Sequence, residues 1–269
     1  MADKRYVAGF IGIGNMGGTL ASVCAKAVGG ASVAVSNHSP EKAAAFVRDY
    51  GCAVLTNSEI AEKCDYVFLG VKPQMLPGVL TDISEGLKKN SNPTVVSMAA
   101  AVTSETIREG LGGYKGKLIR IMPNMPAKVY EGMTLCSYSD DMTDDAKAAF
   151  TAILNGAGEF EELPEKLIDA GSAVSGCGPA FVYMFIEALA DAGVECGLPR
   201  AKAQKLAAQT VIGAGKSVLA FGNPGSLKDA VCSPGGTTIA GVHALEERGF
   251  RGTAMDAVVA SYKRTLELK

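Results

Sequence analysis

Short apolar runs alternate with longer helical segments through the first part of the chain. The runs are rich in Val, Ile, Leu and Phe and predict strands at residues 6–11, 32–36, 53–55, 65–69, 94–98 and 117–121. The segments between them predict helices near residues 17–28, 40–50, 75–83 and 104–111. Because strands that alternate with helices form parallel sheets, the pattern predicts a doubly wound α/β sheet with helices on both faces.

The pattern changes after Leu163 and Pro164, where strand-like runs stop. Helical runs broken by Gly and Pro follow, at residues 178–196, 199–221, 238–248 and 252–268. The run from Ala180 to Val194 is apolar on nearly all sides through Ile186, which predicts deep burial, and its later acidic residues argue against a membrane span. We therefore expect two domains, an α/β domain at 1–163 and an all-α domain at 164–269 that completes its core against a partner subunit.

Composition narrows the classes of partner and site. The formal net charge is −2, so no excess of positive charge is available for nucleic acid or an anionic membrane, and we expect neither as a partner. The seven cysteines are scattered, without a CxxC pair or a His–Cys cluster. This arrangement is typical of reduced thiols in the cytoplasm, and we expect no disulfide frame and no metal site. The glycine-rich run near the N-terminus argues against a signal peptide.

That glycine-rich run, GFIGIGNMGG at residues 9–18, contains a G-x-G-x-x-G pattern. Its glycines are Gly12, Gly14 and Gly17, and they lie between a predicted strand and a predicted helix, which is the context of a dinucleotide site. We expect Gly12 to allow the tight turn, Gly14 to let a pyrophosphate approach the backbone, and Gly17 to let the helix pack on the strand. The helix N-terminus would supply amides to the phosphates.

The end of the second predicted strand bears on the choice of cofactor. An NAD site usually has Asp or Glu there, whereas this chain has Ser36, Asn37, His38 and Ser39, with the first carboxylate at Glu41 inside the next helix. These groups can donate hydrogen bonds to a 2′-phosphate, so NADP (as NADPH) is favoured and NAD remains the alternative. His38 has a second interpretation, as an ordinary surface histidine.

A second candidate site lies in CSPGGTTIAGVHALEE, residues 232–247. Two glycines precede two threonines and an apolar helical ridge, which describes a helix start with free N–H groups. Such a start binds small anions, and the hydroxyls can add to it. The candidate residues for a carboxylate ligand are Ser233, Gly235, Gly236, Thr237 and Thr238. An ordinary capped helix is the alternative interpretation.

Stretches along the whole chain resemble the pyrroline-5-carboxylate reductase family. They are GFIGIGNMG at 9–17, VKPQ at 71–74, SMAAAVT at 97–103, RIMPNMPA at 120–127, SGCGPAFVYMFIEALADAGV at 175–194 and LKDAVCSPGGTTIAGVHALEERGFR at 227–251. The last is the most specific of them. The chain departs from many members in lacking a Glu before the Leu227-Lys228-Asp229 stretch.

The resemblance implies a cytoplasmic oxidoreductase of proline biosynthesis that reduces 1-pyrroline-5-carboxylate to L-proline with NADPH or NADH. It also implies a Rossmann domain followed by a helical domain that interleaves with a second copy, as a homodimer or larger homo-oligomer. By resemblance, the cofactor contacts are Ile13, Gly14, Asn15, Met16, Ser36, Asn37, His38, Ser39, Asn57, Val71, Lys72, Pro73, Ala99, Ala100 and Asn124. The substrate loop is 233–238, and Thr238 bonds the ring nitrogen.

The residues also suit the chemistry of such a reduction. A protonated imine is a strong electrophile, and solvent supplies that proton near neutral pH, so a neutral hydroxyl suffices where a strong acid is absent. The rival enzyme class is the β-hydroxyacid dehydrogenases, whose catalytic lysine would have to be Lys202, Lys205 or Lys216. A non-catalytic NADP-binding sensor is the other alternative. Arg120 either pairs within the sheet or contacts a ligand.

Overall fold

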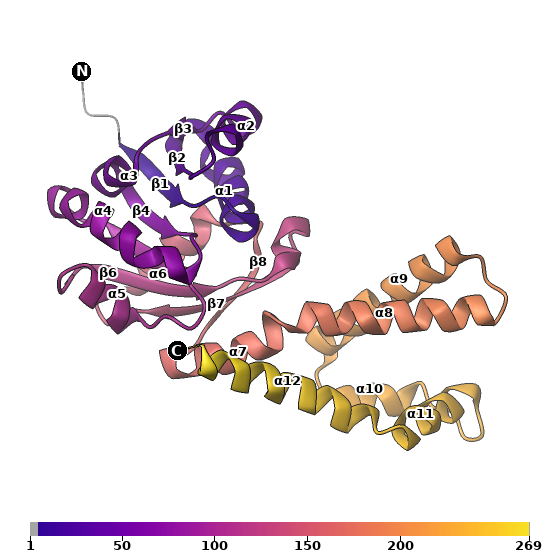
Figure 1. Cartoon of the computed structure of the whole chain (residues 1–269). Helices are drawn as coiled ribbons and strands as arrows, with labels where there is room; N and C mark the ends of the chain where they lie inside the picture. The colour runs from indigo at the N-terminus through magenta and orange to yellow at the C-terminus, as the bar shows by residue number, and fades with distance from the viewer. Residues whose placement is uncertain (1–4, 269) are drawn as a thin grey trace. The chain divides into compact units, whose positions relative to one another are not determined.

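The computed structural model describes residues 5–268, which form two compact units. Of the described residues, one unit comprises 5–176 together with 262–268, and the other is Cys177–Ser261 (Figure 1). Helix α7 (Glu165–Ser175) therefore packs with the first unit, although the sequence places it at the start of the helical domain.

The first unit contains an eight-stranded sheet of order β3-β2-β1-β4-β5-β6-β7-β8. Its strands are β1 (Tyr6–Ile11), β2 (Val33–Ser36), β3 (Ala53–Val54), β4 (Cys64–Leu69), β5 (Thr94–Ser97), β6 (Lys117–Met122), β7 (Gly132–Tyr138) and β8 (Gly158–Glu162). The first six are parallel, as predicted, with β1 at the crossover point between β2 and β4. The last two were not predicted, and they make the sheet mixed because β7 runs antiparallel to β6.

Helices cover both faces of this sheet, as the strand–helix alternation predicted (Figure 1). They are α1 (Asn15–Val28), α2 (Pro40–Tyr50), α3 (Asn57–Lys63), α4 (Leu76–Lys89), α5 (Ser104–Gly110) and α6 (Asp144–Ile153), with 3-10 turns η1 (Gly30–Ser32), η2 (Pro73–Met75) and η3 (Met125–Val129). Leu20 of α1 and Phe150 of α6 belong to one buried cluster. Ile60 of α3 and Ile83 of α4 belong to a second cluster. The predicted fold class is confirmed.

Local chemistry sets where α2 begins. The Ser39 hydroxyl accepts from the Lys42 N–H, and Pro40 is the first helical residue. Proline suits that position because its missing N–H would have no intrahelical partner. The helix ends at Gly51, whose φ of +70° lies in the left-handed region.

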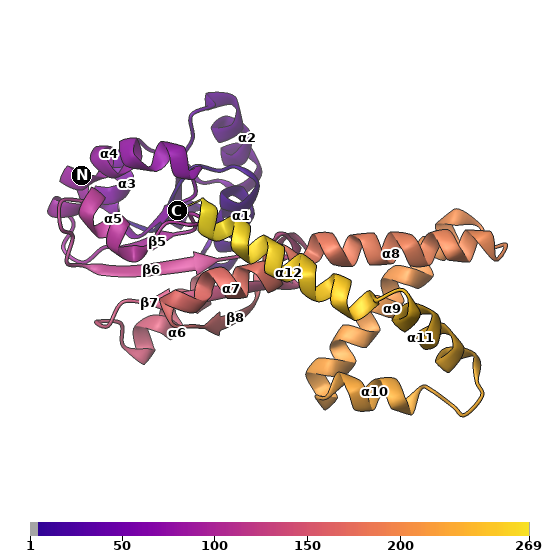
Figure 2. The same cartoon turned by 60° about the horizontal axis from the view of Figure 1, so that its bottom comes forward.

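The α7 helix lies against β6 and β7 (Figure 2). Its Ile168 is fully buried and packs with Met122 and Leu135, the second on β7. These three side chains come from three different elements. Helix α7 therefore covers the sheet at the side where the unpredicted strands β7 and β8 lie. The packing accounts for the assignment of α7 to the first unit.

The second unit is helical and contains α8 (Gly178–Glu195), α9 (Arg200–Phe221), α10 (Pro224–Ala230), α11 (Thr237–Glu247) and most of α12 (Phe250–Glu267). Helices α8 and α9 meet through Ala190, Ala203 and Ala207, which are small residues that allow close contact. The predicted deep burial of α8 is not found within one chain, since Tyr183 and Met184 are more than half exposed. The apolar face of α8 is left uncovered by its own chain.

One helical stretch among the described residues, Glu165–Glu195, is long and apolar enough to cross a membrane by length and composition. It comprises α7 and α8. Glu187 and Asp191 lie within it, and charged side chains are costly inside a bilayer. Helices that pack against other protein meet the same criterion, so length and composition do not distinguish a span from an interface helix.

Candidate active site

The glycine turn between β1 and α1 has two glycines that packing requires. Gly12 has φ +91°, and a Cβ there would lie 2.9 Å from the backbone of Gly70 at the end of β4. A Cβ at Gly17 would lie 2.1 Å from the Gly12 carbonyl oxygen. By contrast, a Cβ at Gly14 would meet no atom within 4 Å. The surface at Gly14 is therefore open, as a close approach by a ligand would require.

The start of α1 is suited to an anion. Gly14 is its N-cap without a side-chain cap, and its first turn contains no acidic residue. The N–H groups of a first helical turn lack intrahelical acceptors and create positive potential. The Ile13 N–H is directed elsewhere, since it donates to Asn37 Oδ1 at 3.2 Å. The backbone amides of Asn15, Met16 and Gly17 are thus the donors that the helix start leaves without intrahelical acceptors, since the Gly18 N–H already donates to the Gly14 carbonyl.

A cleft of about 560 Å³ opens beside this turn, between the ends of β1, β2 and β4. Seven residues predicted to bind the cofactor lie around it together with Gly12, namely Gly14, Ser36, Asn37, His38, Asn57, Val71 and Lys72. In open α/β sheets, ligands bind at this carboxyl edge of the strands, next to the point where the strand order reverses. Ile13 and Asn15 line a neighbouring cavity that shares Gly14.

A chain of hydrogen bonds fixes one wall of the cleft. The Ser36 hydroxyl donates to Asn57 Oδ1 at 2.7 Å, and Asn57 Nδ2 donates to Asp82 Oδ2 at 3.2 Å. Asp82 lines the cleft from α4 and was missed from the sequence. An acidic residue on the polar face of a predicted helix gives no local signal that it reaches another element.

The structure places Ser39 away from the cleft lining, at the N-cap of α2. Its hydroxyl also donates to Glu41 at 2.8 Å, which lowers the pKa of that carboxyl. The hydroxyl is thus engaged by its own helix. The side chain of His38 is exposed at the cleft rim.

The two loops that follow β5 and β6 hold three further predicted cofactor residues, Ala99, Ala100 and Asn124. Ala99 is 2% exposed, its N–H donates to Ser97 Oγ at 3.3 Å, and Ala101 in the same loop has φ +60°. Asn124 follows β6, where its Nδ2 donates to the Ser175 carbonyl at 2.9 Å and its Oδ1 accepts from the Met133 N–H at 2.9 Å. Asn124 therefore braces the end of α7 and the start of β7. Pro73 begins η2, directly after Lys72, which lines the cleft.

The predicted substrate loop lies in the second unit and forms a tight turn. The Gly236 N–H donates to the Ser233 carbonyl at 3.0 Å, and Gly235 has φ +68°, a conformation that favours glycine. Helix α11 begins at Thr237, with Gly236 as N-cap, no side-chain cap and no acid in its first turn. The Thr237 and Thr238 residues are exposed. The loop thus offers amides and hydroxyls without a carboxylate of its own.

Other polar candidates have structural positions. Lys228 donates to Asp229 at 2.6 Å on α10. Arg120 is 1% exposed and donates to Asp169 of α7 at 2.6 Å, so it pairs with a helix rather than within the sheet. Its partner lies on a helix that the sequence analysis did not predict. The lysines that a β-hydroxyacid dehydrogenase would need are exposed along α9.

The thiols are free and, in the first unit, protected. All seven cysteines are unpaired with one another, and Cys24, Cys52, Cys64 and Cys136 are buried. Burial raises the pKa of Cys24, Cys64 and Cys136 to about 12 and that of Cys52 to about 11. Such thiols stay protonated near neutral pH and are poor nucleophiles. Within residues 5–268, no three His, Cys, Asp or Glu side chains are grouped as metal ligands.

Comparison with known proteins places the chain among enzymes of one kind. Residues 165–268 match the family model for pyrroline-5-carboxylate reductase dimerisation, and residues 7–101 match that for coenzyme F420-dependent NADP oxidoreductases. The curated pyrroline-5-carboxylate reductase of Escherichia coli (strain K12) is 42% identical over 97% of both chains. The Pisum sativum enzyme of that name is 39% identical over 99% of this chain and 97% of the relative.

Solved structures agree with the sequence comparison. The pyrroline carboxylate reductase of Plasmodium falciparum, crystallised with NADP bound, superposes with a TM-score of 0.85 at 31% identity over 98% of both chains. The pyrroline-5-carboxylate reductase of Coxiella burnetii gives a TM-score of 0.89 at 30% identity over 99% of both chains. Relatives this similar over nearly the full length decide against a β-hydroxyacid dehydrogenase. The chain belongs to the pyrroline-5-carboxylate reductase family.

Proposed function

We propose that this chain reduces 1-pyrroline-5-carboxylate to L-proline, with NADPH as the hydride donor. The observation that carries the proposal is the identity of about 40% with curated pyrroline-5-carboxylate reductases over nearly the whole chain. The glycine turn and the 233–238 loop support it, because both are built for anionic groups. The activity makes the chain an NADP(H)-dependent oxidoreductase acting on a C=N bond.

The cofactor fits the cleft of the first unit. The absent Cβ at Gly14 leaves space at the start of α1, where we place the pyrophosphate against Gly14 and the amides of Asn15 and Met16. Ser36, Asn37 and His38 end β2 without a carboxylate, which suits the 2′-phosphate of NADP. An NADP-bound relative and the NADP oxidoreductase match support this choice.

The remaining cofactor contacts follow the loops around the cleft. We place the adenosine ribose near Ser36 and Asn57, Ile13 with the pyrophosphate, and the flanks of the cofactor at Val71, Lys72 and Pro73, whereas the Ser39 hydroxyl is engaged by its own helix. We assign the nicotinamide side to Ala99, Ala100 and Asn124. The hydrogen bonds of Asn124 to two backbone groups give it a bracing role that is compatible with a place beside the nicotinamide.

The substrate residues do their work through position and electrostatics. NADPH, when bound, supplies the hydride that reduces the imine carbon. The backbone amides of Gly235, Thr237 and Thr238 hold the substrate carboxylate at the start of α11, while the Thr238 hydroxyl orients the ring nitrogen, which solvent protonates. The glycines let the small ring come close to the backbone. Correct placement alone can lower a barrier of this kind by several kcal/mol.

A second copy of the chain is the partner that we propose for the helical unit. Apolar side chains on α8, α9 and α12 are left open, including Met184 at 69%, Leu219 at 84% and Met255 at 68% exposure. The match of residues 165–268 to a dimerisation model supports a homo-oligomer. We propose a homodimer with interleaved helices and a functional domain boundary at 163/164. We also propose a cytoplasmic location, with which the free thiols are consistent.

A steady-state assay tests the function. Purified protein is given NADPH or NADH with 1-pyrroline-5-carboxylate, and in parallel with a panel of β-hydroxyacids and the oxidised cofactors. We expect oxidation of NADPH only with the imino acid. Turnover of a β-hydroxyacid, or binding of NADPH without any turnover of the imino acid, would contradict the proposal. The Gly236→Val variant is the matched control, since it should block substrate at the loop while NADPH binding is retained.

A further inference from the structure

The loop that joins β5 to α5, residues 98–103, contains a backbone conformation that costs energy. Ala101 has φ +60°, in the left-handed region where residues other than glycine are disfavoured. Helix α5, which follows the loop, is short, extending only from Ser104 to Gly110. A helix of this length is marginal without tertiary contacts. The conformation of the loop therefore depends on what holds its two ends.

The β5 end of the loop is held by the sheet. The Met98 N–H donates to the Leu69 carbonyl at 3.3 Å, and the Ala99 N–H donates to Ser97 Oγ at 3.3 Å. Ser97 is fully buried. The strand and its buried hydroxyl thus fix the direction in which the chain leaves β5.

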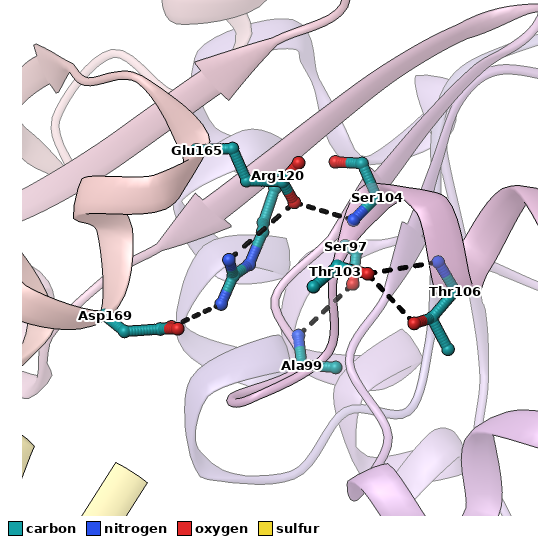
Figure 3. A network of polar contacts seen from close by, with 8 residues as sticks. All are labelled: Ser97, Ala99, Thr103, Ser104, Thr106, Arg120, Glu165 and Asp169. Atoms are coloured by element: carbon teal, nitrogen blue, oxygen red, sulfur yellow. Dashed lines mark hydrogen bonds and ion pairs between the residues drawn. The ribbon is translucent and has the colours of Figure 1, made fainter. Parts of the chain in front are cut away.

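The α5 end is held by a carboxylate from another element. Glu165, the first residue of α7, accepts from the Ser104 N–H at 2.6 Å (Figure 3). The Thr103 hydroxyl accepts from the Thr106 N–H at 3.1 Å. The Thr103 cap and the Glu165 carboxylate therefore accept from two different N–H groups at the start of α5. A negative charge at a helix N-terminus is also favoured by the helix dipole.

Arg120 holds this carboxylate in place. Its Nη1 lies 3.7 Å from Glu165 Oε1, and its Nη2 lies 2.6 Å from Asp169 Oδ1, one helical turn further along α7 (Figure 3). The guanidinium is 1% exposed, so it cannot swing into solvent. A rigid cation on β6 therefore sets the position of Glu165, and Glu165 sets the position of Ser104.

We propose that Glu165 is a positioning residue, which clamps the 98–103 loop in the conformation that presents Ala99 and Ala100 to the nicotinamide. The inference rests on the proposed function for the identity of that ligand, but the clamp itself lies wholly within residues of the first unit. Since Glu165 opens the helix that leads into α8, the clamp also ties the loop to the segment that matches the dimerisation model.

Two substitutions and a control separate the clamp from general stability. Glu165→Ala removes both the acceptor and the charge, whereas Glu165→Gln keeps an oxygen for the Ser104 N–H and loses the attraction to Arg120. Glu85→Ala is the matched control, because Glu85 is an exposed glutamate that pairs with Lys88 on α4. All three are compared with the wild type as the full chain.

The first readout needs neither cofactor nor activity. Hydrogen–deuterium exchange of the amides in residues 98–104 should be faster in Glu165→Ala, intermediate in Glu165→Gln, and unchanged in Glu85→Ala. Exchange at the wild-type rate in Glu165→Ala would overturn the clamp. If Glu165→Ala does not fold, the intermediate rate of Glu165→Gln decides the question in the same way.

The second readout is kinetic. Because a small misplacement of reacting groups costs rate more than affinity, kcat of Glu165→Ala should fall about 10-fold while KM for NADPH changes less than about 2-fold. Glu165→Gln should recover part of the loss, and the isotope effect on kcat with NADPH deuterated at C4 should rise in Glu165→Ala. A change in KM alone, or equal loss in both variants, contradicts the positioning role. A wild type inactive on the imino acid refutes the proposed function instead.

Discussion

Gly14 and Gly17 lie three residues apart in the same motif, yet the structure predicts opposite effects for the same substitution. At Gly17 the added methyl would lie 2.1 Å from the Gly12 carbonyl oxygen, a backbone atom in a buried turn. At Gly14 the backbone has φ −66° and ψ −161°, which any residue adopts, and the methyl meets no protein atom within 4 Å. Gly17→Ala should therefore damage folding, and Gly14→Ala should damage binding.

The magnitudes follow from these contacts. Overpacking against backbone costs about 3 kcal/mol, and the helix propensity of Ala over Gly returns about 1 kcal/mol, so Gly17→Ala should lose about 2 kcal/mol of unfolding free energy. In a unit of this size that loss lowers Tm by roughly 4–8 °C. Gly14→Ala should change stability by less than about 1 kcal/mol. If the pyrophosphate packs on Gly14, the methyl should weaken NADPH binding at least about tenfold, or by about 1.4 kcal/mol.

Thermal unfolding with and without NADPH measures both effects in one assay. At a concentration of NADPH 100 times the wild-type Kd, binding stabilises the wild type by about 2.7 kcal/mol, and a tenfold weaker Kd reduces this to about 1.4 kcal/mol. Gly14→Ala should thus have the wild-type Tm alone and a smaller shift with NADPH. A full NADPH shift in Gly14→Ala would refute the placement of the pyrophosphate. A wild-type Tm in Gly17→Ala would refute the packing argument.

Three further predictions concern other parts of the chain. Thr238→Ala should lower kcat/KM by roughly 10- to 100-fold in a steady-state assay, because one orienting hydrogen bond is lost, and an unchanged value removes Thr238 from the mechanism. Asp169→Ala removes the 2.6 Å partner of the buried Arg120, so chemical denaturation should show a loss of about 3–5 kcal/mol, and a loss below 1 kcal/mol contradicts it. Stability should also fall as pH rises above 9, because burial raises the pKa of thiols such as Cys64 from 9.0 to about 12, and the unfolded chain then releases protons that the folded chain keeps. At pH 10 each such thiol lowers the free energy of unfolding by about 1 kcal/mol. The Tm of Cys64→Ala should therefore fall less between pH 9 and 11 than that of the wild type.

The parts of the fold that the sequence predicts are those that local chemistry encodes. The parallel strands are short apolar runs because both of their faces are buried, and the start of α2 is marked by its own cap and proline. Strand β8 has the sequence GEFEE and lies at the edge of the sheet. Its charged residues leave no apolar run from which a strand could be predicted. Helix α3 was missed for a similar reason, since its segment NSEIAEK is mostly polar and is shaped by a capping box.

The same distinction applies to the site, where some residues depend on neighbours in the sequence and others on distant elements. Gly12 and Gly17 are required by atoms of the same turn or of the adjacent strand end, so the motif reports them from sequence. Glu165 and Asp82 act on elements far from them in the chain, and each is an acidic residue of a helix with no local sign of its role. The partners of Glu165 are known only once the fold brings α7 beside Arg120 of β6 and Ser104 of α5, and that of Asp82 only once α4 lies beside α3. Residues that position a site from a distance are therefore the ones that the structure adds, and Glu165 is where that addition can be tested.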